Sequence, residues 1–216
     1  MKSLPSRAPK PKKRAAKKPR ARERLHVDER RGQLLAAALT AFSEQPYDEV
    51  SLDDIAATVG ISRPLIFHYF PTKRDFYVAT MQTAASDFLA STMETPGRTP
   101  FERLELGLDA HFHYVEGHAK GYSALLRGGI GSDPEILGIV ELTRSHILQR
   151  IRVELPEEIR DDPRLRAALR GWIGFMEAIS LDWIDHRDLA RAELKALALQ
   201  ALAALLGEHA SNMLAT

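Results

Sequence analysis

The chain contains no cysteine, and it has no apolar run long enough to cross a membrane. Without cysteine the protein can form no disulfide, no thiolate metal site and no cysteine nucleophile, which agrees with a reducing cytoplasm. The longest uncharged stretch near the C-terminus runs from Ala196 to Gly207, whereas a membrane span needs roughly 20 apolar residues. We therefore expect a cytoplasmic protein without a membrane partner.

Sequence signatures of catalysis are missing as well. The chain has no phosphate-binding glycine loop, nucleophile elbow or paired-carboxylate motif. His111 and His113 are two positions apart, so on a helix they point to different faces and cannot bind one metal ion. Asp182 and His186 share a helix face, which permits a two-ligand site or a local ion pair, but the sequence indicates no third ligand. We expect no enzyme activity, no metal and no cofactor.

No segment shows the sustained alternation of a β-strand, whereas capping residues mark one helix after another. Two short helices lie between Ser51 and Phe70, and longer ones are expected to start at Asp28, Thr72, Thr99, Asp133, Asp162 and Asp188. Four of these longer helices should end near Met93, Lys120, Leu155 and Ile184, and a Pro96-Gly97 break follows the first of the four. Glycines 128, 129 and 131 interrupt the segment from Gly121 to Gly131, which is a short helix or a loop. The pattern predicts an all-α fold of about nine helices.

The two short helices are joined at Gly60, which can adopt the left-handed conformation that ends a helix. Ser51 is placed to cap the first helix with Asp54 three residues on, and Ala56 is small enough for a close helix crossing. Ser62 is placed to cap the second helix. Pro64 is tolerated in its first turn, and Ile66 and Phe70 turn to the core. The pattern is typical of a helix-turn-helix, although an ordinary helical corner would share these features.

The outward residues of the second helix suit a recognition helix in the major groove of DNA. Arg63 can form a bidentate hydrogen bond to guanine, whereas Pro64, Leu65 and Phe67 offer only apolar contacts to thymine methyl groups. Tyr69 and Lys73 are expected on phosphates, and Thr72 with Asp75 should cap the next helix against the DNA backbone. The predicted DNA-binding residues are Ser51, Ser62, Arg63, Pro64, Leu65, Phe67, His68, Tyr69, Thr72 and Lys73.

The segment from Arg31 to Met81, with its His-Tyr-Phe-Pro-Thr-Lys run after the turn, resembles the DNA-binding domain of the TetR (tetracycline-repressor-like) family of transcriptional regulators. The resemblance implies an all-α homodimer whose C-terminal domain binds a small molecule and thereby loosens the grip on an operator. Gln45-Pro46 stands where the family usually has a glycine turn. Phe67 replaces a common tyrosine, which removes a hydroxyl that often reaches DNA.

Charge divides the chain into a basic tail and an acidic remainder. Residues 1–24 hold eleven of the 30 Lys and Arg but one of the 29 Asp and Glu, with almost nothing to bury, so we expect a disordered tail. No apolar core follows its charges, so it is not a signal peptide. The tail is either an arm that adds affinity for DNA or a solubilising extension. Residues 25–78 would form the DNA-binding domain and residues 79–216 the effector-binding and dimerisation domain.

The last two expected helices are too apolar for an isolated surface position and could form a four-helix dimer interface, with a monomeric helical core as the alternative. The predicted interface residues are Leu169, Trp172, Ile173, Leu197, Ala201 and Leu205. Residues that could line a ligand pocket, or belong to the core instead, are Phe88, Met93, Phe112, Tyr122, Arg127, Phe175 and Met176. Few charged residues fall on these faces, which favours a lipophilic or acyl-type effector, and Arg127 or Arg144 could bind the phosphates of an acyl thioester.

Together these patterns predict a sequence-specific DNA-binding transcriptional regulator. It would be a repressor that a small, lipophilic or acyl-type ligand releases from a near-palindromic, double-stranded DNA operator. The alternative is an architectural protein that coats DNA with its basic tail and has no small-molecule effector. A carrier of apolar ligands would leave Arg63 and the tail unexplained.

Overall fold

The computed structural model describes residues 20–93, 99–127 and 133–207, and over these ranges the chain folds into ten α-helices and one 3₁₀ helix, with no strand. The expected all-α class is confirmed. In chain order the helices are α1 (Arg20–Glu44), η1 (Tyr47–Glu49), α2 (Leu52–Val59), α3 (Arg63–Tyr69), α4 (Lys73–Met93), α5 (Pro100–Gly117), α6 (Ala119–Arg127), α7 (Pro134–Val153), α8 (Glu157–Arg160), α9 (Pro163–His186) and α10 (Arg191–Leu206).

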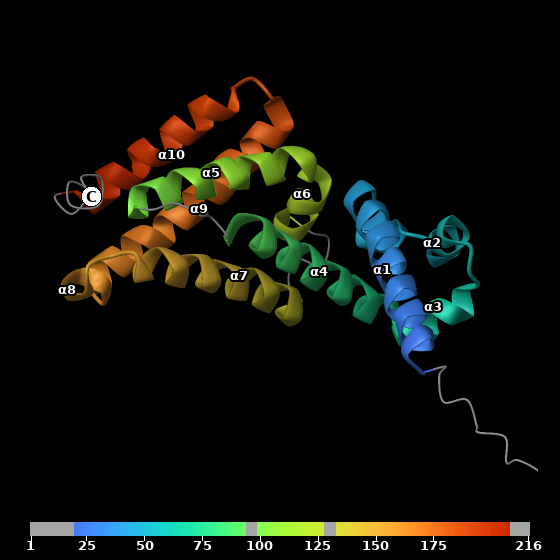
Figure 1. Cartoon of the computed structure of the whole chain (residues 1–216). Coiled ribbons are helices and arrows are strands. Elements are labelled where there is room, and N and C mark those ends of the chain that lie inside the picture. Colours follow the sequence, from blue (N-terminus) through green and yellow to red (C-terminus); the bar gives the residue numbers. More distant parts are fainter. Residues whose placement is uncertain (1–19, 94–98, 128–132, 208–216) are drawn as a thin grey trace, which may run out of the picture.

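Helices α1 to α3 gather at one end of the molecule and form a small head, while α5 to α10 form a larger body (Figure 1). Helix α4 connects the two parts, because it starts beside α3 and runs into the body alongside α7 (Figure 1). The expected boundary between residues 78 and 79 therefore falls inside a continuous helix. Helix α4 therefore belongs to both the head and the body.

The apolar side chains form two cores. The first surrounds Leu34, Ile66 and Phe76, all at 0% exposure, and it continues into the body through Leu125 of α6 and Ile136 of α7. Gly121 marks the closest approach of α6 to α1, since an added Cβ would lie 3.4 Å from the Leu39 side chain. The head is thus packed against the body as well as joined to it through α4.

The second core lies in the body, where α5, α9 and α10 meet. Leu169 on α9 and Ala198 on α10 are both 0% exposed, and Trp172 donates its indole N–H to the Ala198 carbonyl oxygen over 2.9 Å. Helix α10 therefore buries its Leu194, Ala198, Leu202 and Leu206 side against the same protomer.

Most expected helix starts are present and have their capping bonds. Thr99 and Glu102 form the reciprocal capping box at the start of α5. The carboxylate of Asp133 accepts the Glu135 and Ile136 amides at the start of α7, and that of Asp162 accepts the Arg164 amide at the start of α9. These side chains satisfy amides that have no partner within the helix.

Several boundaries differ from the predictions. Helix α1 begins at Arg20, not at Asp28, so Arg20 to Arg24 are helical where a disordered tail was expected; the Arg, Ala and Glu residues of this stretch all favour helix. Helix α5 ends at Gly117, ahead of the expected Lys120, because a separate helix starts at Ala119.

The last helix was also predicted to start too early. Its N-cap is Ala190, whose backbone N–H donates to the Glu193 carboxylate over 2.7 Å, so α10 begins after Asp188. The 3₁₀ helix η1 and the single-turn α8 were not expected at all, since three or four residues are too few for a periodic pattern.

Three predictions concern positions outside the described residues. They are the tail up to residue 19, the Pro96-Gly97 break and the glycines at 128, 129 and 131.

Candidate nucleic-acid interface and ligand cavity

The turn between α2 and α3 has the geometry that the sequence predicts. Gly60 adopts the left-handed conformation at φ 72° and ψ 38°, and the following Ile61 amide donates to the Ala56 carbonyl over 2.9 Å. Ile66 is fully buried and Phe70 nearly so. These contacts fix α3 on the head and leave its opposite side in solvent.

The exposed side of α3 forms a recognition face, which we define as Ser62, Arg63, Pro64, Leu65, Phe67 and His68. Leu65 and Phe67 are 36% and 38% exposed, so this face presents apolar side chains to solvent next to the Arg63 cation. Ser62 occupies the N-cap position, but the expected capping bond from its side chain is not formed. The Ser62 hydroxyl is therefore not used in capping α3.

Arg63 is held by a residue that the sequence analysis missed. Its Nη1 lies 2.8 Å from Oδ2 of Asp53 on α2, and its guanidinium stands over the Phe67 ring at 5.8 Å from the centroid. Asp53 and Arg63 share no short motif, so only the folded turn brings them together. The single bond to Nη1 leaves other guanidinium donors for a base edge.

The residues expected on phosphates are placed around the start of α4. Thr72 and Asp75 form a reciprocal cap, with both the Thr72 amide and hydroxyl donating to the Asp75 carboxylate. Lys73 donates to the Asp48 carbonyl over 3.2 Å and lies over the Tyr47 ring. Tyr69 is half-buried beside the His68 ring, and Ser51 caps α2 by accepting the Asp54 amide. Of the expected set, Thr72, Lys73 and Ser51 therefore already have intramolecular partners.

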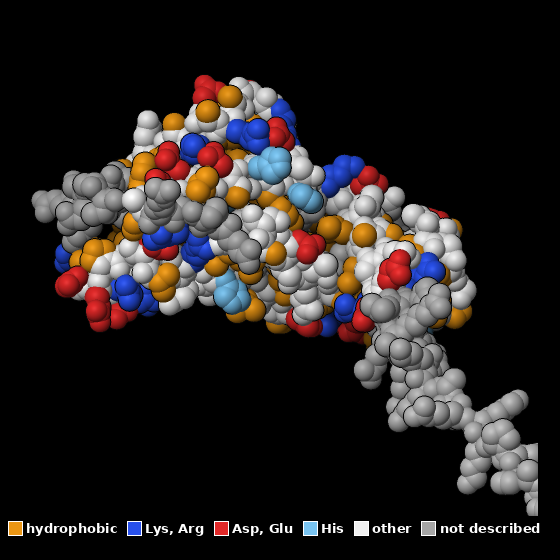
Figure 2. All heavy atoms as spheres, viewed as in Figure 1, with side chains coloured by type: hydrophobic (Ala, Val, Ile, Leu, Met, Phe, Trp, Pro, Cys, Tyr) orange, Lys and Arg blue, Asp and Glu red, His pale blue; other side chains and the backbone are white. Residues whose placement is uncertain are grey.

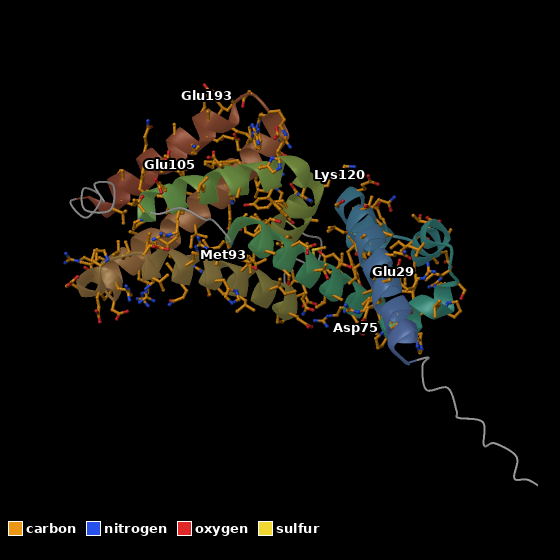
Figure 3. All side chains as sticks on the ribbon, in the orientation of Figure 1. Glu29, Asp75, Met93, Glu105, Lys120 and Glu193 are labelled. Atoms are coloured by element: carbon orange, nitrogen blue, oxygen red, sulfur yellow. The ribbon has the colours of Figure 1, made fainter. Side chains whose placement is uncertain are left out.

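The body contains a cavity of about 130 Å³, partly open to solvent, between α4, α5, α7 and α9. Figure 3 shows Met93, one of its lining residues, at the end of α4 that lies inside the body. The lining residues are Thr92, Met93, Pro100, Arg103, Leu104, Gly107, Leu108, His111, Ile147, Arg150, Ile151, Glu154, Trp172, Ile173, Met176 and Glu177.

The cavity has polar ends and apolar walls between them. At the outer end Arg103 of α5 and Glu154 of α7 form a bidentate ion pair, with Nε and Oε1 2.9 Å apart, and this bond raises the pKa of Arg103. Leu104, Leu108 and Ile151 follow. At the inner end burial lowers the pKa of His111 to about 4, so its ring is neutral at pH 7. The expectation of few charged residues is wrong here, because Arg103, Arg150, Glu154 and Glu177 all reach the lining.

Two of the predicted pocket residues, Met93 and Met176, line this cavity. Phe88, Phe112 and Tyr122 lie behind the lining in the second core, where Phe88 packs edge-on against His111. Phe175 is partly buried against the same core. Arg127 pairs with Asp185 and Arg144 with Glu177, and neither is among the residues that line the cavity. Arg103 and His111 could have been found from sequence, since they lie on one α5 face with Leu104 and Leu108.

The predicted dimer residues separate into two groups. Leu169, Trp172 and Ile173 are at most 4% exposed within one protomer, so their assignment to an interface is wrong; they pack in the second core, and Trp172 and Ile173 also line the cavity. Leu197 and Leu205 are 40% and 48% exposed on the outer side of α10, and Ala201 is partly buried. On α9 the outer side carries small residues, namely Ala167, Gly171, Gly174 and Ala178.

No group of three or more potential metal ligands occurs among the described residues. His111 bonds to Ser180, whereas His113 on the other side of α5 contacts Arg191. Asp182 and His186 form a local pair at 3.4 Å, and the Asp182 carbonyl and carboxylate raise the pKa of His186. Within the same ranges no helix is long and apolar enough to pass through a membrane.

An all-α chain that presents one exposed helix on a two-helix turn is a helix-turn-helix protein. Residues 34–80 match the bacterial regulatory proteins of the tetR family, and residues 100–205 match the tetracyclin repressor-like C-terminal domain. The chain belongs to the TetR family of transcriptional regulators.

Among its relatives is the transcriptional activator FasR of Mycolicibacterium smegmatis, 29% identical over 121 residues, which are 55% of each chain. The chain thus spans about half the length of the curated relatives that it matches. A TetR-family regulator from Streptomyces coelicolor is 36% identical, with a TM-score of 0.74 over 86% of this chain and 83% of that one. FadR of Bacillus subtilis, solved with stearoyl-CoA, is 20% identical with a TM-score of 0.66 over 81% and 97%, a likeness in fold.

Proposed function

We propose that the protein is a homodimeric repressor that binds a near-palindromic DNA operator and leaves it when a small lipophilic molecule enters the body cavity. The observation that carries this proposal is the recognition face of α3, where a cation and apolar side chains stand in solvent on a rigidly packed helix. An α-helix of this kind fits the major groove, and its first residues reach base edges. Such a regulator acts in the cytoplasm, where bacterial DNA is found.

The outer side of α9 and α10 supports a dimer. Gly171 and Gly174 leave space on the α9 surface, since an added Cβ would meet nothing within 4 Å. A second copy of α9 can therefore approach closely, and Leu197 and Leu205 of α10 would be covered at the same time. Two-fold symmetry would place two recognition helices on successive half-sites, about 34–36 Å apart on B-DNA.

A direct link between cavity and head supports the response to a ligand. Arg74, in the first turn of α4, forms a bidentate pair with Asp133, the N-cap of α7, with atoms 2.6 Å and 2.8 Å apart. This bond holds the pKa of Asp133 below its usual value. The far ends of the same two helices line the cavity through Met93 and Ile151. A ligand that separates α4 from α7 would thus shift the helix on which α3 is mounted.

The lipophilic class of effector is supported by the cavity walls, where apolar side chains outnumber polar ones. A cavity of about 130 Å³ is small beside the roughly 300–1,000 Å³ of drug-sized sites. A compact molecule fits this volume, whereas a long acyl chain would extend beyond it.

Footprinting on genomic fragments tests the proposal against the alternative of a DNA-coating protein. The expected result is protection of one short near-palindrome in excess non-specific DNA. Even protection of all fragments at the same concentration would favour the coating protein. Because FasR is named as an activator, a reporter with the protected site should be measured with and without the protein, and a fall in transcription is expected for a repressor.

A further inference from the structure

The inner end of the cavity contains a chain of three hydrogen-bonding side chains from three helices. Nε2 of His111 on α5 lies 2.8 Å from Oγ of Ser180 on α9. Tyr122 of α6 lies beside the same Ser180 hydroxyl, which acts to lower the pKa of the Tyr122 phenol while burial raises it more. Ser180 is fully buried and Tyr122 is 5% exposed, so water does not compete for these bonds. His111 borders the cavity, and the other two side chains stand behind it.

The hydrogen-bonded side chains determine whether Nδ1 of His111 is a donor or an acceptor toward the cavity. Burial raises the pKa of Tyr122, which keeps its proton and can donate to Ser180. Ser180 then donates to Nε2 of His111, and the neutral ring carries its proton on Nδ1. If the Tyr122 and Ser180 hydroxyls donate in the opposite direction, Nε2 carries the ring proton and donates to Ser180, and Nδ1 becomes an acceptor. His111 can thus offer either a donor or an acceptor, but not a charge.

Nδ1 of His111 has no protein partner within the described part of the chain, because the contacts of this ring are the Ser180 bond and the neighbouring aromatic rings. Among those residues Arg160 has the one fully buried side-chain nitrogen without a partner. Nδ1 of His111 is therefore accessible, and the space beside it is the cavity. A purely hydrocarbon ligand would cover this nitrogen without a hydrogen bond, which costs roughly 1–3 kcal/mol in general.

The inner end of the cavity offers no charge to attract an anionic ligand, because Glu177 is already paired with Arg144 and His111 is neutral. The Glu177 carboxylate also lines the inner end, where Arg144 holds it through two bonds of 2.8 Å and 2.6 Å. A ligand carboxylate or phosphate at this end would face Glu177 and a neutral imidazole. An uncharged hydroxyl or carbonyl would meet a hydrogen-bonding partner in His111 and no repulsion.

We propose that His111, positioned by Ser180 and Tyr122, is the specificity subsite of the cavity and binds an uncharged oxygen group, a hydroxyl or a carbonyl, on a compact apolar effector. The proposal rests on the proposed function in taking the cavity as the effector site. The size agrees with a compact ligand, because about 130 Å³ approaches the roughly 150 Å³ of a cavity known to bind benzene.

Two nearly isosteric probes test the subsite, benzyl alcohol with its hydroxyl and ethylbenzene without it. Their dissociation constants are measured by ligand titration for the full chain and for two variants, His111→Phe and His113→Phe. Phenylalanine keeps the ring and removes its nitrogens, and His113 is the matched control on the exposed side of α5. In His111→Phe the affinity of benzyl alcohol relative to ethylbenzene should fall about tenfold, the effect of one hydrogen bond. In His113→Phe this ratio should not change.

The unmodified protein provides a second measurement, in case the buried substitution prevents folding. The ¹⁵N signal of Nδ1 of His111, identified by a ring that remains neutral at pH 5, should shift with benzyl alcohol and much less with ethylbenzene. Phenylacetate should bind more weakly than benzyl alcohol. An equal ratio in His111→Phe, an unshifted Nδ1 signal, or no saturable binding of either probe would overturn the subsite. Operator footprinting on the same preparation tests the proposed function separately, since DNA binding does not require the probe.

Discussion

Gly174→Leu should weaken dimerisation while it stabilises the single protomer. Gly174 lies in the middle of α9 on its outer side, and an added Cβ meets nothing within 4 Å. Within one protomer the leucine has room, and replacing glycine inside a helix stabilises the fold by about 0.5–1 kcal/mol. That gain corresponds to a rise of about 2 °C in melting temperature for a domain of this size.

In the proposed dimer the same side chain stands between two closely packed α9 helices. Overpacking costs about 1–3 kcal/mol per site, and the two-fold axis repeats it, so the loss should be about 2–6 kcal/mol. The dimer dissociation constant should rise at least about thirtyfold. Sedimentation equilibrium measures this constant, and urea unfolding at a concentration below it measures the protomer.

Gly138→Leu is the matched control. Gly138 is also exposed inside a helix, α7, and an added Cβ there again meets nothing within 4 Å. It should give the same stabilisation and leave the dimer intact. If Gly174→Leu dimerises as tightly as the unmodified chain, or if Gly138→Leu is the variant that dissociates, the α9 interface is refuted.

Four further predictions follow from the same structure. Arg63→Ala should cost about 1–3 kcal/mol of operator binding and relax the base preference at one position per half-site; equal loss on all sequences in a binding-site selection would place Arg63 on a phosphate. Asp133→Asn keeps an N-cap but removes one of the two carboxylates that pair with Arg74, the other being Glu135, so operator affinity should persist while its response to ligand declines in gel shifts. The pKa of His111 is about 6.5 in the unfolded chain and about 4 in the folded one, so between these pH values the unfolded chain binds one more proton than the folded chain. The free energy of unfolding should therefore fall by about 3 kcal/mol from pH 7 to pH 4. Urea unfolding should show no such contribution in His111→Phe. Deleting residues 1–19, which leaves α1 complete, should flatten the salt dependence of DNA binding, and an unchanged slope would show that the tail does not contact DNA.

The parts of the fold that depend on local chemistry could be predicted from the sequence. The left-handed Gly60, the Thr72–Asp75 cap and the Asp133 and Asp162 starts follow from residues within a few positions of one another. The start of α10 was placed too early because Asp188 is a residue type that commonly caps helices. The capping bond in the structure runs from the Ala190 N–H to the carboxylate of Glu193, three residues further on. Local chemistry permitted both starts, and the structure shows the one with the Ala190–Glu193 bond.

The parts that depend on tertiary contacts could not be predicted. An apolar residue such as Leu169 is equally suited to a core and to an interface, and only the fold shows that α10 covers it. The cavity and the Arg63–Asp53 contact depend in the same way on helices that are distant in sequence or joined by a turn. Surface charge does not mark the position of a site either, since acidic and basic side chains are interspersed over the face in Figure 2.

The contact between Asp53 and Arg63 has a consequence for how the protein would search a genome. An arginine with a carboxylate at 2.8 Å attracts phosphates less than a free one, because the two charges largely cancel at a distance. Its remaining N–H groups still match a guanine edge. Arg63 would therefore contribute little to residence on random DNA and more to residence on the operator. The pair would thereby lower the affinity for random DNA relative to the operator, and this ratio decides how a regulator is distributed over a genome.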